Sequence, residues 1–468
     1  MFFWNKKNLV LPSGAKADDF VNAGTPLKFN TVDFRDGQQS LFATRFTTEE
    51  MIPVLEQFDS IGFNSMEMWG GATFDVCVRY LNEDPWERLR TFKKYVKKTP
   101  LKMVLRAQNL VGYKAYPDDI VESFVRKTAE NGIDVFLTFD ALGDLRNCET
   151  AFKAAKKAGK RVEGSLQYNV SPFHTIENFV QNAKDQINMG VDALHIEDMA
   201  GLMTPTAAYD LVTALKKEIR VPISLHCHCT GGMAQMAYWE AIRAGIDELD
   251  VCVSSLSGGP SLPPAESFIV GLKGTSRDPK IDLSKFQLIN DHFMEVRKKH
   301  ADTESRLVGV DVGCLQHQVP GGMLSNLESQ LTAMKLYHRL PEVLEEVTKV
   351  RADMGYPPLA TPSSQMCGAQ ATTNVLTGKR YGMVSKEMRD YCRGMYGKAP
   401  GPIAEELMTA ALHGEAPMSN RPADNLAPGM EAAKAEAGNF ARTEEDVLTY
   451  ALFPSTAPDF LKKKYSGQ

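Results

Sequence analysis

The stretch ALHIEDMAGLMTPTAAYDLVTALKKEIRVPISLHCHC, residues 193–229, contains the unit that decides the fold. Its two ends, ALHIED and PISLHCHC, are short runs with the apolar character of buried strands. Between them, Thr204 precedes Pro205, as an N-cap residue precedes a first-turn proline in a helix. An apolar stripe at helical spacing follows, formed by Ala208, Leu211, Val212, Leu215 and Ile219. The stretch therefore predicts a strand, a helix and a second strand.

The same unit recurs on both sides of this stretch, at intervals of about 25 to 40 residues. Eight strand-like runs lie at 28–35, 63–69, 102–109, 135–140, 162–169, 193–198, 222–229 and 248–255. Another helix start is marked by Thr47 and Glu50, which form a capping-box pattern. Eight such units predict a parallel TIM (β/α)₈ barrel. The alternative is a doubly wound open sheet, but the first run is followed by RDGQQS rather than by a glycine-rich dinucleotide loop.

Beyond about residue 280 the apolar pattern becomes helical, and its longest run lies at 323–355. We therefore predict a barrel over residues 1–300 and a mostly helical C-terminal extension over residues 301–468. Within the extension, residues 414–441 are rich in Ala, Pro, Gly and Asn, which is typical of a mobile linker.

Composition excludes several classes of protein. The 468 residues are 43% hydrophobic and carry a net charge of −5, without the basic excess of a nucleic-acid binder. No apolar run reaches the roughly 20 residues that span a bilayer, and the opening MFFWNKKNLVLPSG lacks the features of a signal peptide. We expect a cytoplasmic protein whose eight cysteines are reduced thiols.

Polar residues gather at the predicted carboxyl ends of the strands, where barrels of this kind carry their reacting groups. The most specific pattern is His226-Cys-His228, because alternate residues of a strand share one face. Both imidazoles then point into the barrel, and Leu225 and Cys227 face the helices. Two inward imidazoles predict a metal site; the alternative is a pair of hydrogen-bonded core histidines. The other candidates at these ends are Arg35, Asp36, Glu67, Arg106, Asp140, His195 and Glu197.

Asp36 is the natural carboxylate partner of the two histidines, one residue past the first predicted strand. Two histidines and one carboxylate suit zinc, manganese or cobalt and leave positions open for a carbonyl oxygen. Glu197 has three interpretations: a fourth ligand, an outer partner of the site, or an acceptor that caps the next loop. Arg35 and Arg106 either bind a substrate carboxylate or neutralise nearby acidic groups.

Three longer motifs point to a known family. They are TVDFRDGQQSLFATR at 31–45, EMWGGATFDVCVRYLNEDPWERLR at 67–90 and LRAQNLVGY at 105–113. In them the chain resembles the biotin-dependent carboxyltransferases, which include the carboxyltransferase domain of pyruvate carboxylase, the alpha subunit of oxaloacetate decarboxylase and the barrel subunit of transcarboxylase. The resemblance continues through SLHCHCTGG at 224–232, VPGGMLSNL at 319–327, TPSSQM at 361–366, YGKAPGPI at 396–403 and EDVLTYALFP at 445–454. It covers nearly the whole chain.

The resemblance implies roles for individual residues. It places the metal ligands at Asp36, His226 and His228, in agreement with the pattern argument. It also matches Asp75 and Tyr113 with a pair that helps to form the biotin pocket.

The resemblance further matches Arg35, Gln39 and Arg106 with groups that hold a 2-oxoacid and its enolate. No AMKM-like biotinylation sequence is present, so the biotin is expected on a separate carrier protein. The implied assembly contains that carrier, other carboxylase or decarboxylase subunits, and a homodimer of this chain.

Several positions depart from the family pattern. Glu197, in EDMAG, stands where the family has a metal-bound lysine, and Pro260, in SGGPSLP, stands where it has a proton-shuttling threonine. Leu137 replaces an arginine, and Gly143 changes the ALND motif to ALGD.

Because of these departures two other functions stay open. One is a metal-dependent lyase or aldolase that works without biotin, and the other is a non-catalytic paralogue that assembles with an active carboxylase. Ser257 or Ser261 are candidates for the missing hydroxyl, and Cys229 is a candidate soft metal ligand; their structural alternatives are an ordinary tight turn and a packed small residue.

Overall fold

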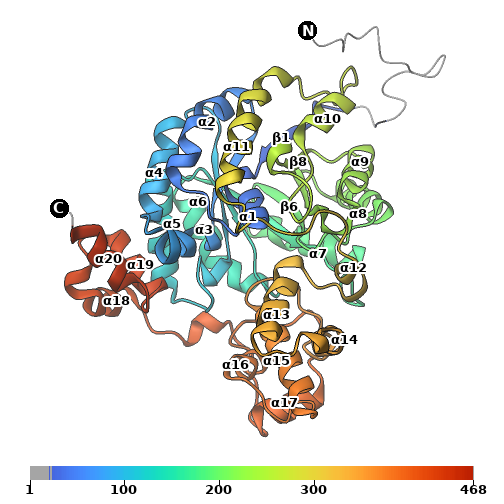
Figure 1. Ribbon diagram of the computed structural model, residues 1–468. Coiled ribbons are helices and arrows are strands. Elements are labelled where there is room, and N and C mark those ends of the chain that lie inside the picture. Colours follow the sequence, from blue (N-terminus) through green and yellow to red (C-terminus); the bar gives the residue numbers. More distant parts are fainter. Residues whose placement is uncertain (1–20, 22–23, 467–468) are drawn as a thin grey trace.

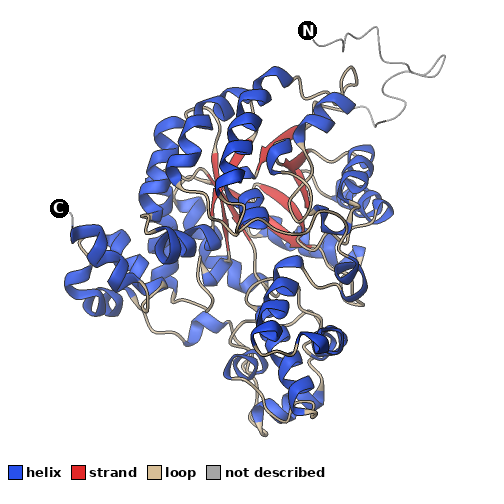
Figure 2. Cartoon of the chain, in the orientation of Figure 1, coloured by secondary structure: helices blue, strands red, loops and turns tan. Residues whose placement is uncertain are grey.

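A computed structural model describes residue 21 and residues 24–466; the N-terminal stretch 1–14, for which no signal peptide is predicted, lies outside the described residues. Eight parallel strands form a closed barrel in sequence order, with β8 paired to β1 (Figure 2). The strands are β1 Lys28–Thr31, β2 Ser65–Trp69, β3 Leu101–Leu105, β4 Val135–Thr138, β5 Arg161–Gln167, β6 Ala193–Asp198, β7 Ile223–Cys227 and β8 Glu248–Val251. The predicted barrel and all eight of its strands are confirmed.

Helices surround the barrel (Figure 1). They are α2 Thr48–Ile61, α4 Pro85–Tyr95, α5 Asp118–Asn131, α6 Glu149–Lys157, α7 Ile176–Asn188, α8 Pro205–Glu218, α9 Ala234–Ala244, α10 Ala265–Gly271 and α11 Phe286–Lys299. Both predicted helix starts are present. The Thr47 hydroxyl accepts the Glu50 backbone N–H and the Glu50 carboxylate accepts that of Thr47, while Thr204 caps α8 by accepting the N–H of Ala207.

The apolar core lies between the strands and these helices, where Leu194, Ile196, Leu225 and Leu249 are fully buried. No helix of the described residues is long and apolar enough to cross a bilayer. All eight cysteines lie in the described part of the chain, and each is a free, buried thiol, as predicted.

The inside of the barrel is polar at its amino end, in contrast to the branched apolar layers common in such barrels. Lys102 Nζ lies 2.7 Å from a carboxylate oxygen of Glu163, and both side chains are fully buried. Asn30 donates to Glu248 at 3.2 Å and to Asp250 at 3.0 Å. A buried ion requires a partner, and this network supplies one for each charge it holds. Asp250 connects the network to the carboxyl end of the barrel.

The first part of the C-terminal extension is a helical unit with a core of its own. It contains α12 Val312–His317, α13 Gly321–Ala333, α14 Leu340–Asp353, α15 Ser363–Thr377, α16 Lys386–Cys392 and α17 Glu405–Leu412. Its core includes one barrel residue, Leu142, from the loop after β4. In return, Ala360 of the helical unit packs against the barrel residues Val104, Leu137 and Phe139. The unit therefore lies against the carboxyl end of the barrel.

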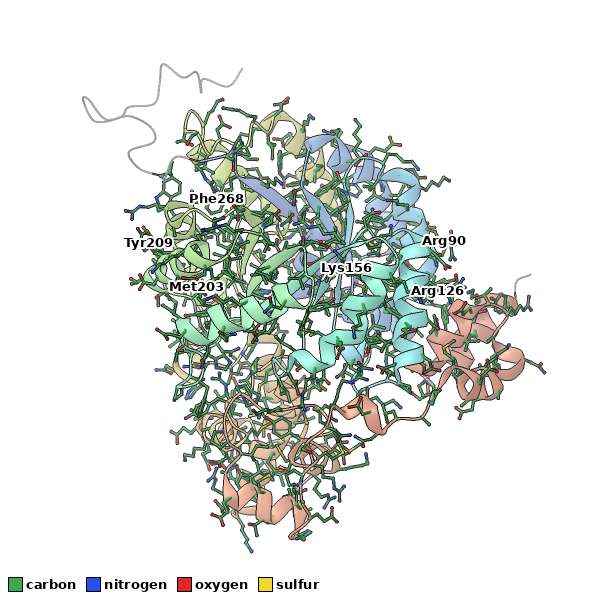
Figure 3. All side chains as sticks on the ribbon, turned by 180° about the vertical axis from the view of Figure 1, so that it is seen from behind. Arg90, Arg126, Lys156, Met203, Tyr209 and Phe268 are labelled. Atoms are coloured by element: carbon green, nitrogen blue, oxygen red, sulfur yellow. The ribbon has the colours of Figure 1, made fainter. Side chains whose placement is uncertain are left out.

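The last part of the extension belongs to the barrel core instead. Helices α19 Glu444–Leu452 and α20 Ala457–Ser466, with the turn between them, contribute Leu448, Phe453 and Phe460 to the core that the strands and outer helices share. The Phe453 ring stacks on Phe74, with centroids 5.6 Å apart. Figure 3 shows Arg126 of α5 beside these helices, where it pairs with Glu444. The extension predicted over 301–468 thus comprises two differently packed parts.

The predicted linker, residues 414–441, is only partly irregular. It contains a 3₁₀ turn, Pro422–Asn425, and helix α18 Met430–Ala437, in which Ala437 is fully buried. The helix within the predicted linker has a physical reason, because the alanine-rich composition that indicated a linker also has the highest intrinsic helix propensity.

Candidate metal centre and its surroundings

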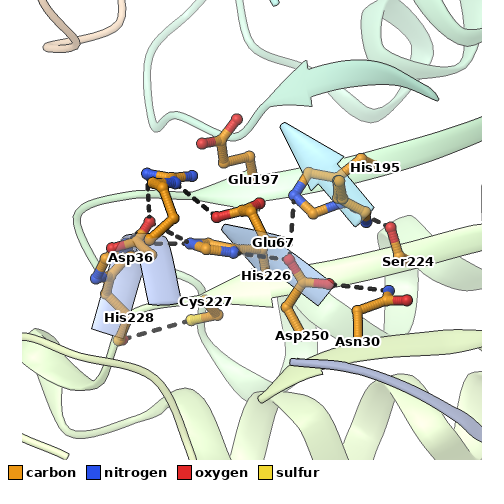
Figure 4. A network of polar contacts seen from close by, with 12 residues as sticks. Asn30, Asp36, Glu67, His195, Glu197, Ser224, His226, Cys227, His228 and Asp250 are labelled. Atoms are coloured by element: carbon orange, nitrogen blue, oxygen red, sulfur yellow. Dashed lines mark hydrogen bonds and ion pairs between the residues drawn. The ribbon is translucent and has the colours of Figure 1, made fainter. Parts of the chain in front are cut away.

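Three side chains converge at the carboxyl end of the barrel (Figure 4). The Nε2 atoms of His226 and His228 lie 3.1 Å apart, and the Asp36 carboxylate lies 3.5 Å from the first and 3.7 Å from the second. All three side chains are buried. The histidines leave β7 and its end as predicted, but Asp36 is presented differently, because β1 ends at Thr31 and Asp33–Gly37 forms a π-helical turn.

Both histidines are oriented through their other ring nitrogen. His228 Nδ1 lies 2.6 Å from the backbone carbonyl of Pro260, and His226 Nδ1 lies 3.0 Å from the Asp250 carboxylate. A carbonyl only accepts, so His228 donates from Nδ1 and presents a lone pair at Nε2. Asp250 favours the same arrangement in His226. Carboxylate or carbonyl partners of this kind typically fix metal-binding imidazoles.

The electrostatics of the cluster favour a cation. Burial raises the pKa of Asp36, but Arg35 and the two histidines outweigh it and lower that pKa well below its usual range. Burial lowers the pKa of His226, yet hydrogen bonds to Asp250 and Asp36 raise it to about 10. The two facing imidazole nitrogens and the ionised Asp36 carboxylate thus stabilise positive charge between them, and a divalent metal fits this donor set.

Arg35 lies directly beside this cluster. Its guanidinium contacts Asp36 at 2.9 Å and Glu67 at 2.6 Å, so it neutralises both acidic groups, as one of the two predicted roles requires. Burial raises the pKa of Glu67 to about 7, against the opposing effect of Arg35. The Nη2 atom of Arg35 is buried without a hydrogen-bond partner in the described chain. That nitrogen remains available for a substrate, which is the second predicted role.

Arg106 is held at the end of β3 by backbone carbonyls. Its Nη1 donates to Val111 at 3.2 Å and to Gly112 at 3.1 Å. Burial is the main reason why the pKa of Arg106 is lowered from its ordinary value. A Cβ atom added at Gly71 would lie 2.4 Å from the same Nη1. The space that Arg106 occupies therefore depends on a glycine at position 71.

The residues matched with the biotin pocket also meet. The Tyr113 hydroxyl donates to the Asp75 carboxylate at 3.1 Å, from the loop after β3 to the short helix α3 Gly71–Val76. Tyr113 is exposed, and its ring lies 5.4 Å from the Arg106 guanidinium. Gln39 lies half-buried on α1 Gln38–Phe42, next to the turn that carries Asp36.

Glu197 lies beside the metal ligands but does not join them. Its Oε2 accepts hydrogen bonds from Gln167 at 2.5 Å and from Ser165 at 3.0 Å. Two clusters of the described residues have metal-ligand spacing, namely Asp36 with His226 and His228, and His195 with His226 and Asp250. Glu197 belongs to neither. In Figure 4 no contact joins Glu197 to Asp36 or His228. The hydrogen bonds from Gln167 and Ser165 are compatible with the interpretation of Glu197 as an outer partner, and its role stays a prediction.

His195 is a buried histidine with a polar partner at each ring nitrogen. Its Nδ1 lies 2.7 Å from the Ser224 hydroxyl, and its Nε2 lies 3.7 Å from Asp250. Burial lowers the pKa of His195 to about 4, so the ring is neutral near pH 7.

The side chains considered as replacements for the missing groups are engaged elsewhere. Ser261 donates to the Leu256 carbonyl at 2.7 Å, and Ser257 donates to that of Ser254 at 3.0 Å. Burial raises the pKa of the Cys229 thiol to about 12, and the residue belongs to neither metal-spaced cluster. This arrangement fits the alternatives given for these residues, namely an ordinary tight turn and a packed small residue.

Some residues of the site are absent from the prediction. Asp250, Gln167 and Ser165 point inward from β8 and β5, and the Pro260 carbonyl acts through the backbone. The alternation of polar residues in ELDV and VEGSLQ would have indicated the three side chains. A backbone carbonyl leaves no such signal.

Comparisons with known proteins agree with this geometry. A family model described as HMGL-like matches residues 26–292, and one described as a conserved carboxylase domain matches residues 314–468. A pyruvate carboxylase subunit of Methanocaldococcus jannaschii is 53% identical, over 94% of this chain and 79% of its own length. The methylmalonyl-CoA carboxyltransferase 5S subunit of Propionibacterium freudenreichii subsp. shermanii is 44% identical, over 92% of this chain and 87% of its own length.

Solved structures lead to the same family. The carboxyl transferase domain of Rhizobium etli pyruvate carboxylase, solved with pyruvate, superposes with a TM-score of 0.90 at 30% identity; the match covers 96% of this chain and 79% of that domain. The same domain was also solved with pyruvate and biocytin. The chain therefore belongs to the biotin-dependent carboxyltransferase family, together with these pyruvate carboxylase and methylmalonyl-CoA carboxyltransferase proteins.

Proposed function

We propose that this chain moves a carboxyl group between carboxybiotin, held on a separate carrier protein, and a small 2-oxoacid such as pyruvate or oxaloacetate. The observation that carries the proposal is the convergence of Asp36, His226 and His228 beside two arginines, the buried Arg35 and the half-buried Arg106. Relatives named for pyruvate carboxylase and 2-oxoglutarate carboxylase support a 2-oxoacid substrate.

We assign Asp36, His226 and His228 as the protein ligands of a divalent zinc, manganese or cobalt ion. Such an ion, when bound, supplies Lewis-acid stabilisation of negative charge on a carbonyl oxygen. The assignment rests on the fixed Nδ1 partners of both imidazoles, which leave both Nε2 atoms directed at one point.

We assign Arg35, Gln39 and Arg106 to the substrate. The free Nη2 of Arg35 and the guanidinium of Arg106 would bind the carboxylate of the 2-oxoacid. Because Arg35 is buried and Arg106 half-buried, their charges act through a poorly screened medium on the negative charge that develops during enolate formation. The two arginines thereby orient the substrate.

We assign Asp75 and Tyr113 to the biotin ring. Their hydrogen-bonded pair is supported for this role by the exposure of Tyr113, which makes it accessible to a group carried on another protein. Partner subunits are supported by the names of the relatives, several of which are subunits. The specific carrier, the homodimer and the cytoplasmic location stay predictions.

The test uses the purified chain, a carboxylated carrier protein and isotope-labelled carboxyl groups. We expect label to pass to a 2-oxoacid, and one equivalent of tightly bound divalent metal to copurify with the chain. Arg106→Ala should lower turnover by about 100-fold without a matching loss of stability. No transfer to any 2-oxoacid, together with an unchanged Arg106→Ala variant, would refute the proposal.

The same experiment separates the two rivals. Cleavage of a carbon–carbon bond without any carrier would identify a lyase or aldolase. Absence of both metal and carrier binding would identify a non-catalytic paralogue.

A further inference from the structure

We propose that Glu197 is the catalytic group that carries a proton between C3 of the 2-oxoacid and the ring nitrogen of biotin. The inference rests on the proposed function, and it assigns to this chain a proton carrier that differs from the hydroxyl expected by resemblance at position 260.

The strand register places Glu197 beside the metal site. Glu197 on β6 is the direct neighbour of the metal-site residue His226 on β7, and of Gln167 on β5. Register partners in a parallel sheet share a face, so the Glu197 side chain enters the barrel between them.

Glu197 has one anchored oxygen and one free oxygen. Gln167 and Ser165 both donate to Oε2, and Oε1 has no hydrogen bond within the described chain. The side chain is buried, with 3% of its surface exposed. An anchored carboxylate with a free oxygen matches the requirements of a positioned general base.

Nearby alternatives lack this combination. Pro260 has no hydroxyl, and its carbonyl already accepts from His228. The hydroxyls of Ser257 and Ser261 donate to backbone carbonyls. Glu67 has an unbonded oxygen as well, but it is fully buried and its other oxygen is held by Arg35.

The proposed step balances in protons and electrons. Glu197 takes a proton from C3, and the electron pair of that C–H bond forms the C2–C3 double bond of the enolate. Glu197 then gives the proton to the biotin nitrogen, as the bond from that nitrogen to the carboxyl carbon breaks and leaves its electron pair on nitrogen. The released CO₂ accepts the enolate electron pair, which forms the new carbon–carbon bond.

The test follows exchange of the C3 hydrogens of pyruvate with D₂O by NMR, using the full chain with free biotin. We expect wild type to exchange these hydrogens. The exchange rate of Glu197→Gln should be lower by a factor of about 100 or more. Metal content and pyruvate binding, measured by elemental analysis and calorimetry, should stay at wild-type levels. Formate should restore exchange to Glu197→Ala, because a small carboxylate can fill the vacated space.

Two further variants serve as controls. Glu346→Gln removes a buried carboxylate of the helical unit and should leave exchange unchanged. Glu197→Asp serves as a second variant if Glu197→Gln fails to fold. It retains the carboxylate and should keep measurable exchange. Wild-type exchange rates in folded, metal-loaded Glu197→Gln would overturn this inference alone. Absence of exchange in wild type would overturn the proposed function with it.

Discussion

At the scale of single residues, the metal ligands depend on groups that do not touch the metal position. Asp250 and the Pro260 carbonyl each hold one imidazole by its Nδ1 atom. Pro260 therefore retains a function through its backbone, although its side chain lacks a hydroxyl. Proline at position 260 consequently lacks the hydroxyl of the family pattern but keeps the backbone carbonyl that holds His228.

Asp250→Asn should weaken metal binding about 10- to 100-fold, because the amide holds His226 less firmly than the carboxylate does. Competition with a chelator, monitored by zinc titration, measures the change. Asp247→Asn is the matched control, since Asp247 pairs with Lys216 rather than with a histidine. Equal affinity in wild type and Asp250→Asn would contradict the orienting role.

Gly71→Ala should displace Arg106, because the new Cβ would lie 2.4 Å from the guanidinium Nη1. The Michaelis constant for the 2-oxoacid should rise about 10-fold, in line with a loss of roughly 1.4 kcal/mol in a charge-assisted contact. Steady-state kinetics checks this. Gly309→Ala meets nothing within 4 Å and should behave as wild type, and the prediction fails if both variants share one Michaelis constant.

At the scale of elements, the loop between β5 and α7 contacts the helical unit, since Arg351 donates to Asn169 at 3.1 Å. His174 of this loop lies 2.6 Å from the Ser171 hydroxyl and packs near Phe179. Burial lowers its pKa from 6.5 to about 4, and Arg351 of the helical unit adds to the shift. The loop thus carries an imidazole that resists protonation.

This shift predicts how stability depends on pH. As pH falls from 6.5 to 4, the unfolded chain protonates His174 while the folded chain does not, so folding stability falls over that window. His174→Gln removes this contribution. The stability of wild type relative to the variant should therefore be lower at pH 5 than at pH 7.5 in urea unfolding. A difference between the two proteins that stays constant across these pH values would count against it.

Elements were predicted from the sequence more reliably than their ends. Apolar runs separated by helical stripes predict eight strands correctly, because each strand buries its outer face under a helix. Periodicity does not report where pairing stops, and the predicted strand 28–35 ends at Thr31. Asp36 and both histidines were still predicted as ligands. Their residue types and their places near strand ends can be recognised without knowing where each strand stops.

At the scale of the whole molecule, the first half of the barrel and the helices α19 and α20 share one core. Trp86 donates to the Thr449 hydroxyl at 3.0 Å, and Tyr116 donates to the Leu452 carbonyl at 3.1 Å. This association was not predicted from the sequence. The apolar periodicity of a helix shows which of its faces is buried, but it does not show against which surface that face packs.

Phe453→Ala should lower the free energy of unfolding by about 3–5 kcal/mol, since it removes a buried ring that stacks on Phe74. Because Phe74 precedes Asp75 on α3, carrier-dependent activity should fall as well. Urea unfolding and transfer assays measure the two effects. Lys462→Ala, on the exposed side of α20, should change stability by less than about 0.5 kcal/mol, and an equal loss in both variants would disprove the specific packing role.

The shared core also determines when folding of the barrel can be completed. A ribosome releases the strands long before it releases Leu448 and Phe453, which complete the core around Trp86 and Phe74. During translation, the patch that α19 and α20 cover stays open while the helical unit is already being synthesised. Until α19 and α20 have been synthesised, the nascent barrel therefore exposes an apolar surface, and its core is complete only after these helices have packed.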